Sequence, residues 1–110
     1  MEQTIKLLKE PFISSSVTTP QFLAFYKTFK KEFTDFLTQR KCTQIEIGKG
    51  HFYISGFFTS HTGQVYYFNF GDVRIDGSGR FYYRTATDYK DFTGGHNIWA
   101  YLDKINEMVI

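Results

Sequence analysis

The chain has 110 residues, of which 42% are hydrophobic and 22% are charged, and its formal net charge is +2. This length predicts one domain, residues 1–110, and an aromatic share of 20% argues against a disordered chain. A net charge this close to zero also argues against a protein that holds nucleic acid mainly through contacts to phosphate groups.

The first 18 residues have no clear periodicity, and we expect them to be irregular or to form an edge strand, with one helical turn around Ile5, Leu7 and Leu8 as a further alternative. They lack the basic and apolar regions of a signal peptide, and no apolar run in the chain approaches the length of a membrane span. Cys42 is the only cysteine, so an intramolecular disulfide is impossible. We therefore expect a cytoplasmic protein without a membrane partner.

A long helix is the first clear element. Pro20 suits the first helical position, Thr19 suits the N-cap, and Arg40 and Lys41 suit the C-terminal end of the helix dipole. Between them, apolar residues recur at steps of three and four, as on one face of a helix: Phe22, Phe25, Tyr26, Phe29, Phe33, Phe36 and Leu37.

From Thr43 onward the apolar residues alternate with polar ones, which is typical of strands with one buried face. The alternation predicts four strands, over residues 43–47, 51–59, 65–70 and 80–85. Glycine-containing turns join them, and such short connections make neighbouring strands antiparallel.

The C-terminal part is predicted to be a loop followed by a second helix. Residues 88–97 are polar and contain two glycines, and Asn97 can cap a helix. The apolar residues that follow recur at the spacing of a helix: Ile98, Tyr101, Leu102, Ile105 and Met108 or Val109. The predicted fold class is α+β: an N-terminal helix, a four-stranded antiparallel meander and a C-terminal helix, with the helices packed on one sheet face.

The alternation also assigns the strand residues to two faces of the sheet. The more apolar set is expected to lie against the helices, and it consists of Phe52, Ile54, Gly56, Phe58, Tyr66, Phe68, Phe70, Phe81 and Tyr83. The other set is expected to face water, because antiparallel sheets often leave one face open. It consists of His51, Tyr53, Ser55, Phe57, Tyr67, Asn69, Arg80, Tyr82 and Arg84.

No catalytic or metal-binding motif stands out. The three histidines are too far apart in sequence to form a known ligand motif, and Cys42 follows a helix C-terminus, where the dipole opposes a thiolate. We therefore expect a protein that is not an enzyme and has no metal or cofactor. A small hydrolase or nuclease that uses His and Asp residues is the weakest alternative, and it would require metal-dependent turnover that is lost on changing His51 or His96. Whether Trp99 is a core residue or a surface anchor is left open.

Part of the chain resembles a group of small proteins carried by bacteriophages and mobile elements. The resemblance extends from Lys49 to Asn97, and the stretches that bear it are Lys49–Phe58, Tyr66–Phe68, Asp72–Arg74, Arg84–Asp88 and Asp91–Asn97. It implies a context rather than a function, since small non-enzymatic proteins of such elements are often inhibitors of host defence, of the anti-CRISPR or anti-restriction type. Others bind nucleic acid.

These observations predict a non-catalytic binding protein of a phage or mobile element that inhibits a host defence complex. Its partner would be a host protein or a protein–nucleic-acid complex, bound by the aromatic and basic sheet face and the loop that follows the last strand. The residues expected to bind are Lys49, His51, Tyr53, Tyr67, Arg74, Arg80, Tyr82, Arg84, Asp88, Asp91 and His96. The alternative is a protein that binds single-stranded nucleic acid with the same face, because tyrosine and arginine stack on unpaired bases. The same face could also form a homodimer.

Overall fold

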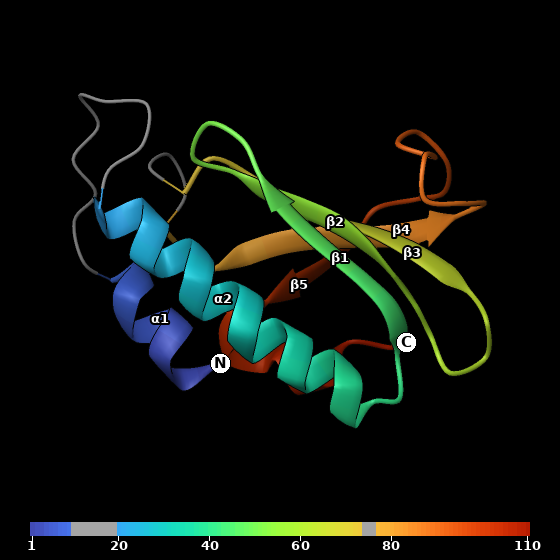
Figure 1. Cartoon of the computed structure of the whole chain (residues 1–110), viewed down its shortest axis with the longest axis horizontal. Helices are drawn as coiled ribbons and strands as arrows, with labels where there is room; N and C mark the ends of the chain where they lie inside the picture. Colours follow the sequence, from blue (N-terminus) through green and yellow to red (C-terminus); the bar gives the residue numbers. More distant parts are fainter. Residues whose placement is uncertain (10–19, 74–76) are drawn as a thin grey trace.

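The computed structural model describes residues 1–9, 20–73 and 77–110, which form an antiparallel sheet with helices against one of its faces (Figure 1). In chain order the elements are α1 (Glu2–Leu8), α2 (Pro20–Gln39), β1 (Thr43–Lys49), β2 (Ile54–Thr59), β3 (Val65–Phe70), β4 (Arg80–Ala86), β5 (Ile98–Tyr101) and the 3₁₀ helix η1 (Leu102–Glu107). The α+β class is therefore as predicted.

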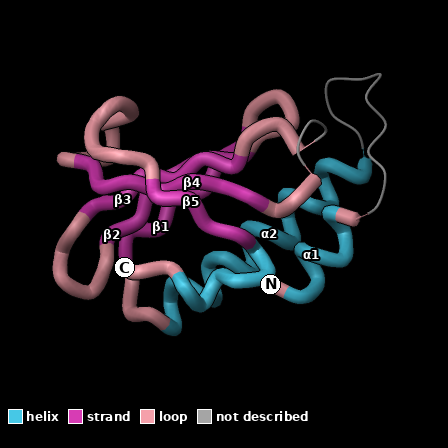
Figure 2. Tube along the Cα trace, turned by 180° about the vertical axis from the view of Figure 1, so that it is seen from behind, coloured by secondary structure: helices cyan, strands magenta, loops and turns pink. Residues whose placement is uncertain are grey.

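The strands lie side by side in the order of the chain, β1-β2-β3-β4-β5, and each pairs antiparallel with the next (Figure 2). Short turns make this meander possible. In the turn between β2 and β3, the amide of Gly63 donates to the carbonyl of Ser60 at 3.0 Å, and Gly63 has a φ of +89°. In this sheet β1 and β5 are the two edge strands.

The core lies between α2 and the sheet, and it is mostly aromatic. The inward side of α2 buries Phe22, Phe25, Phe29, Phe33 and Leu37. The ring of Phe33 lies 5.0 Å from that of Phe68 and 6.0 Å from that of Phe81, in the edge-to-face arrangements that aromatic rings prefer. The strand residues predicted to face the helices all belong to this core or lie in its sheet face: Phe52, Ile54, Gly56, Phe58, Tyr66, Phe68, Phe70, Phe81 and Tyr83.

The end of α2 explains why the chain turns into β1. The amide of Cys42 donates to the carbonyl of Leu37 and that of Lys41 to the carbonyl of Thr38, both at 2.9 Å. Lys41 has a φ of +62°, which is the left-handed conformation that usually ends a helix in this pattern. The predicted start at Pro20 and end near Arg40 agree with these bounds, and the predicted cap Thr19 lies outside the described residues.

The predicted C-terminal helix is wrong. Residues 98–101 form β5, which pairs with β4 from Tyr83↔Ile98 to Arg80↔Tyr101, and only then does the short η1 follow. The sheet therefore has five strands rather than four. Ile98, Tyr101, Leu102 and Ile105 fit a helical period, but pairing with the open edge of β4 decides the conformation of a segment rich in strand-forming side chains.

Two smaller expectations are refined by the structure. Of the alternatives for the start of the chain, Glu2–Leu8 adopts the helical one rather than a strand, and residues 10–18 lie outside the described residues. The carboxylate of Glu32 on α2 accepts the amide of Thr4 at 2.7 Å and holds this helix in place. The second strand begins at Ile54 rather than at residue 51, because Phe52 has a φ of +60° and its carbonyl accepts the amide of Val73 at 3.1 Å.

Candidate binding surface

The sheet face opposite α2, called the far face below, is not open along its whole length. Residues 87–97, called the covering loop below, connect β4 to β5 and fold back onto the sheet. The rings of Tyr89 and Phe92 lie 5.3 and 5.4 Å from the ring of Phe57. As a result Phe57 is only 5% exposed and Tyr67 only 7%. The expectation that both side chains face water was wrong, because a loop distant in sequence covers them.

Asp91 organises the covering loop. Its Oδ1 accepts the amides of Thr93 at 3.1 Å and Gly94 at 2.9 Å, and its Oδ2 accepts the amide of Thr87 at 3.0 Å. These backbone hydrogen bonds lower the pKa of Asp91 below its ordinary value, and the bond from Thr87 has the largest effect. Asp88 makes a similar local contact, since its Oδ1 accepts the amide of Lys90 at 2.8 Å. Both carboxylates thus have a structural reason to occur here.

Arg84 fastens the covering loop to the sheet. Its Nη1 donates to Oδ1 of Asn97 at 3.3 Å, and its Nη2 donates to the carbonyl of Phe92. The guanidinium lies over the ring of Tyr67, 5.0 Å from the ring centroid, and 5.5 Å from that of Tyr82. Arg84 was predicted to bind a partner, but both terminal nitrogens are engaged within the chain.

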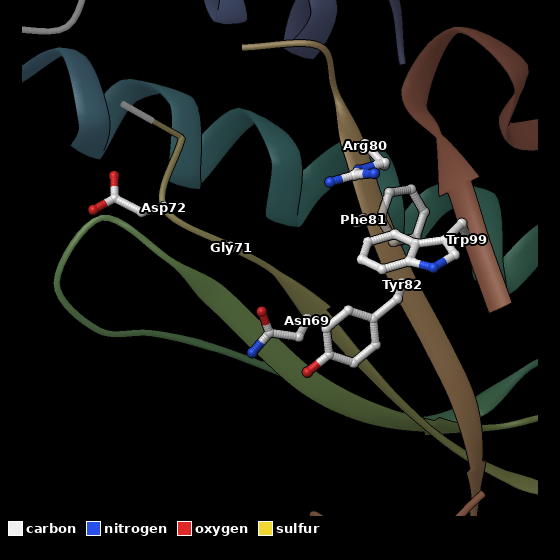
Figure 3. Close-up of a pocket in the computed structure, with 7 residues that line it drawn as sticks. All are labelled: Asn69, Gly71, Asp72, Arg80, Phe81, Tyr82 and Trp99. Carbon is white, nitrogen blue, oxygen red and sulfur yellow. The ribbon is translucent and has the colours of Figure 1, made fainter. Parts of the chain in front are cut away.

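No described residue folds over the other half of the far face, where Trp99 of the edge strand β5 lies between Arg80 and Tyr82 (Figure 3). Register places Asn69, Tyr82 and Trp99 opposite one another on β3, β4 and β5. The guanidinium of Arg80 lies over the Trp99 ring, 4.3 Å from its centroid, and the ring of Tyr82 meets it edge-on at 5.6 Å. We call Asn69, Arg80, Tyr82 and Trp99 the Trp99 patch.

The Trp99 patch adjoins a shallow cavity of about 200 Å³, also lined by Gly71, Asp72 and Phe81. This volume lies below the roughly 300 Å³ at which small-molecule sites usually begin. The Trp99 side chain is in contact with Arg80 and Tyr82, and 52% of it remains exposed. The arrangement suits a protruding group of a larger partner better than an enclosed small ligand.

The remaining predicted residues lie away from this patch or outside the description. Lys49, His51 and Tyr53 are exposed at the connection between β1 and β2, where an added Cβ on Gly50 would meet the Tyr53 ring. His96 is exposed in the covering loop, and Arg74 lies outside the described residues. The structure therefore unites Arg80 and Tyr82 in the patch. Of the other predicted residues that are described, some lie in or under the covering loop, where Tyr67 and Arg84 adjoin Tyr82, and the rest lie at the connection between β1 and β2.

The sequence pattern left the role of Trp99 open and did not include Trp99 or Tyr101 among the binding residues, because both were expected on a helix. A signal was present: Ile98, Trp99 and Tyr101 favour strands, and the two glycines before them end any preceding element. Asn69 was assigned to the correct face, and its Nδ2 donates to the Tyr67 hydroxyl at 3.0 Å at the border between the covered and open halves.

The histidines of the described parts of the chain are not brought together. His51, His61 and His96 lie on three different connections, and residues 1–9, 20–73 and 77–110 contain no group of three or more His, Cys, Asp or Glu side chains able to share a metal ion. Burial raises the pKa of the Cys42 thiol, against the opposing effect of Arg40, so the thiol is protonated at neutral pH.

No protein-family model, curated protein or solved structure matches the chain. Within the described residues, no helix has both the length and the apolar character needed to cross a bilayer.

Proposed function

We propose that this chain is a non-catalytic binding protein that captures a partner protein through the Trp99 patch. The observation on which this rests is a tryptophan that is half exposed yet fixed in place by Arg80 and Tyr82. Tryptophan, tyrosine and arginine are the residue types that most often dominate the energy of protein interfaces. A ring held in one orientation before binding also loses little entropy when the partner arrives.

The surroundings of the patch favour a protein partner. Its residues come from three adjacent strands, and a rigid sheet positions side chains more accurately than a loop does. The cavity beside Trp99 is small and shallow, as expected for a pocket that receives one side chain of a partner. Asp72 and Arg80, which also line this cavity, carry opposite charges, and protein interfaces usually surround their central contacts with such polar residues.

We further propose that the partner is a host protein or a protein–nucleic-acid complex of a bacterial defence system, and that the chain acts in the cytoplasm as an inhibitor of the anti-CRISPR or anti-restriction type. This context is supported by the resemblance of residues 49–97 to proteins of phages and mobile elements.

Capture from bacterial lysate tests the binding role. Immobilised wild type is compared with Trp99→Ala, Arg80→Ala and the control His61→Ala, whose residue is exposed in the turn between β2 and β3. Loss of a hot-spot side chain costs about 2 kcal/mol or more, which is roughly a thirtyfold loss of affinity. We expect one partner to be retained by wild type and His61→Ala but lost by the other two. Equal retention by all four would contradict the role of the patch.

A transformation assay tests the defence context separately. Cells with an active restriction or CRISPR system receive a targeted plasmid while expressing the wild type or Trp99→Ala. An inhibitor raises the number of transformants, and the variant does not. Unchanged numbers with wild type across both classes of system would contradict the inhibitor role, while leaving the binding role intact.

Binding of single-stranded nucleic acid is the second candidate, and it is favoured by the exposed rings of Tyr53, Trp99 and Tyr101. Bases can stack on such rings at about 1–3 kcal/mol per base. The engagement of Arg84 within the chain and the net charge of +2 weigh against it. Fluorescence anisotropy with labelled single strands at low and near-physiological salt decides: tight, salt-sensitive binding supports this candidate, and no binding at low salt eliminates it.

A further inference from the structure

The two edges of the sheet are protected to different degrees. The β1 edge has a register irregularity between Thr43 and Glu46, a left-handed Gln44 with φ +52°, and the charged side chains of Glu46 and Lys49. Irregularities and charges of this kind keep an edge strand from pairing with another chain. The β5 edge has the sequence Ile98-Trp99-Ala100-Tyr101, without a charge and with regular pairing to β4.

Exposed apolar side chains gather at the β5 edge. Of the six large hydrophobic side chains that are exposed in the described part of the chain, four are Ile98, Trp99, Tyr101 and Val109. The first three belong to β5, and Val109 lies in the adjoining C-terminal tail. Such a concentration on a small protein is typical of an interaction surface.

A groove runs along this edge, between β5 on one side and η1 and the C-terminal tail on the other. It has a volume of about 150 Å³, and Lys104 and Glu107 line it together with Ile98 and Val109. Its wall is fixed, because Arg40 donates to the carbonyls of Asn106 at 2.8 Å and Met108 at 3.0 Å. In the described residues neither Lys104 nor Glu107 forms an ion pair.

The order of these two charges along the groove is self-complementary. Lys104 lies shortly after Tyr101, the last residue of β5. The tail that follows Glu107 runs back toward Ile98, the first residue of β5. This is shown by Val109, whose amide donates at 3.1 Å to the hydroxyl of Tyr83, the residue paired with Ile98. A second copy turned by a two-fold axis reverses that order. The lysine of each copy then faces the glutamate of the other.

We propose that β5 pairs antiparallel with β5 of a second copy of this chain, about a two-fold axis at Ala100, so that the two sheets become continuous. Directly opposite residues of antiparallel strands share a face, so Trp99 of each copy meets Tyr101 of the other. The small Ala100 faces its own counterpart on the axis. Both Trp99 patches then lie side by side on one continuous far face, which gives the dimer two adjacent binding patches.

Charge reversal in the full-length chain tests this pairing. Sedimentation equilibrium of the wild type at low salt is expected to show the mass rising with concentration from 12.9 kDa toward twice that value. In a dimer of either single variant, Lys104→Glu or Glu107→Lys, residue 104 of each copy faces a like charge at residue 107 of the other. We expect these two repulsive pairs to weaken association by about tenfold. An equimolar mixture of the two variants restores it, because each then meets the opposite charge, and so does the double variant.

Thermal unfolding of each variant serves as the control: Lys104 and Glu107 are both exposed, so we expect the reversed variants to remain folded. A mass of 12.9 kDa at every concentration would overturn the proposal. So would a dimer that both single variants form as tightly as the wild type, or a mixture that associates no better than either variant alone. None of these outcomes depends on capture of a partner by the Trp99 patch.

Discussion

The covered and open halves of the far face are built from the same kinds of residue but behave differently. In the covered half, Phe57, Tyr67 and Arg84 lie beneath the covering loop, and the first two are nearly inaccessible. In the open half, Tyr82, Arg80 and Trp99 have no such cover, and Trp99 is half exposed. Composition and alternation are therefore not enough to distinguish a second small core from a binding surface.

The two arginines show what makes the difference. Arg80 and Arg84 lie on the same face of β4, and each is stacked on an aromatic ring. Arg84 also donates hydrogen bonds to the carbonyl of Phe92 and the side-chain oxygen of Asn97, and these bonds clamp the covering loop to the sheet. The hydrogen bonds of Arg84 hold the covering loop against the sheet, whereas Arg80 stacks on the exposed ring of Trp99 in the open half, where arginine is a common interface residue.

The largest contrast is expected from truncating one aromatic residue in each half. Phe57→Ala removes a buried ring and leaves a cavity under the covering loop, which costs about 3 kcal/mol in the free energy of unfolding. Trp99→Ala removes a half-exposed ring and costs about 1 kcal/mol or less. Urea denaturation measures both values. Equal losses would mean that the two halves are not distinguished by burial.

A matched pair of arginine variants gives the next largest effect. Arg84→Ala removes two hydrogen bonds and the contact with Tyr67, so we expect a loss of about 1–2 kcal/mol and faster amide hydrogen exchange in residues 87–97. Arg80→Ala leaves exchange in that loop unchanged. If both variants accelerate exchange there equally, Arg84 is not the clamp.

Two glycines allow the same contrast at the level of the backbone. Gly95 in the covering loop has a φ of +73°, and an added Cβ would lie 2.7 Å from the carbonyl oxygen of Thr85, so Gly95→Ala is expected to cost about 1 kcal/mol or more. For Gly71 beside the Trp99 patch, no atom of the described residues lies within 4 Å of an added Cβ, and Gly71→Ala is expected to be close to neutral. Thermal unfolding of the two variants, measured in parallel, checks the ranking.

The smallest effect is expected from acid. The hydrogen bonds to Asp91 lower its pKa in the folded chain, so its contribution to the covering loop is complete above the ordinary aspartate pKa of 3.8 and is lost as the pH falls through the lowered value. The amide resonances of Thr87, Thr93 and Gly94 should shift together in that acidic range. In Asp91→Asn this step should be missing. A step that persists in the variant would assign it to another carboxylate.

Local patterns were sufficient for the helix from Pro20 and for the assignment of the core face. The seven apolar residues of that helix and the alternation in Phe68, Phe70 and Phe81 are properties of short segments, and packing reinforces them. The covering loop and β5 depend instead on contacts between segments distant in sequence. Nothing near Phe92 shows that it packs on Phe57, and the period of Ile98, Tyr101 and Leu102 fits a helix until the edge of β4 offers a partner.

The same reasoning applies to the candidate site. Arg80 and Tyr82 were predicted from the alternation, which also placed Asn69 on their face. The role of Trp99 stayed open because its face depends on whether its segment is a strand. The far face could thus be predicted strand by strand, but which half of it stays open depends on the position of eleven residues, 87–97, relative to the sheet.

Hydroxyl-radical footprinting of the free chain, at a concentration where sedimentation shows a monomer, tests the central claim most directly, because it measures the access of solvent to both halves in one experiment. Oxidation rates are compared, residue by residue, with those of the chain unfolded in urea. We predict strong protection of Phe57 and Tyr67 and little protection of Trp99. Protection of Trp99 equal to that of Phe57, or rapid oxidation of Tyr67, would contradict the division of the far face into a covered half and an open binding half.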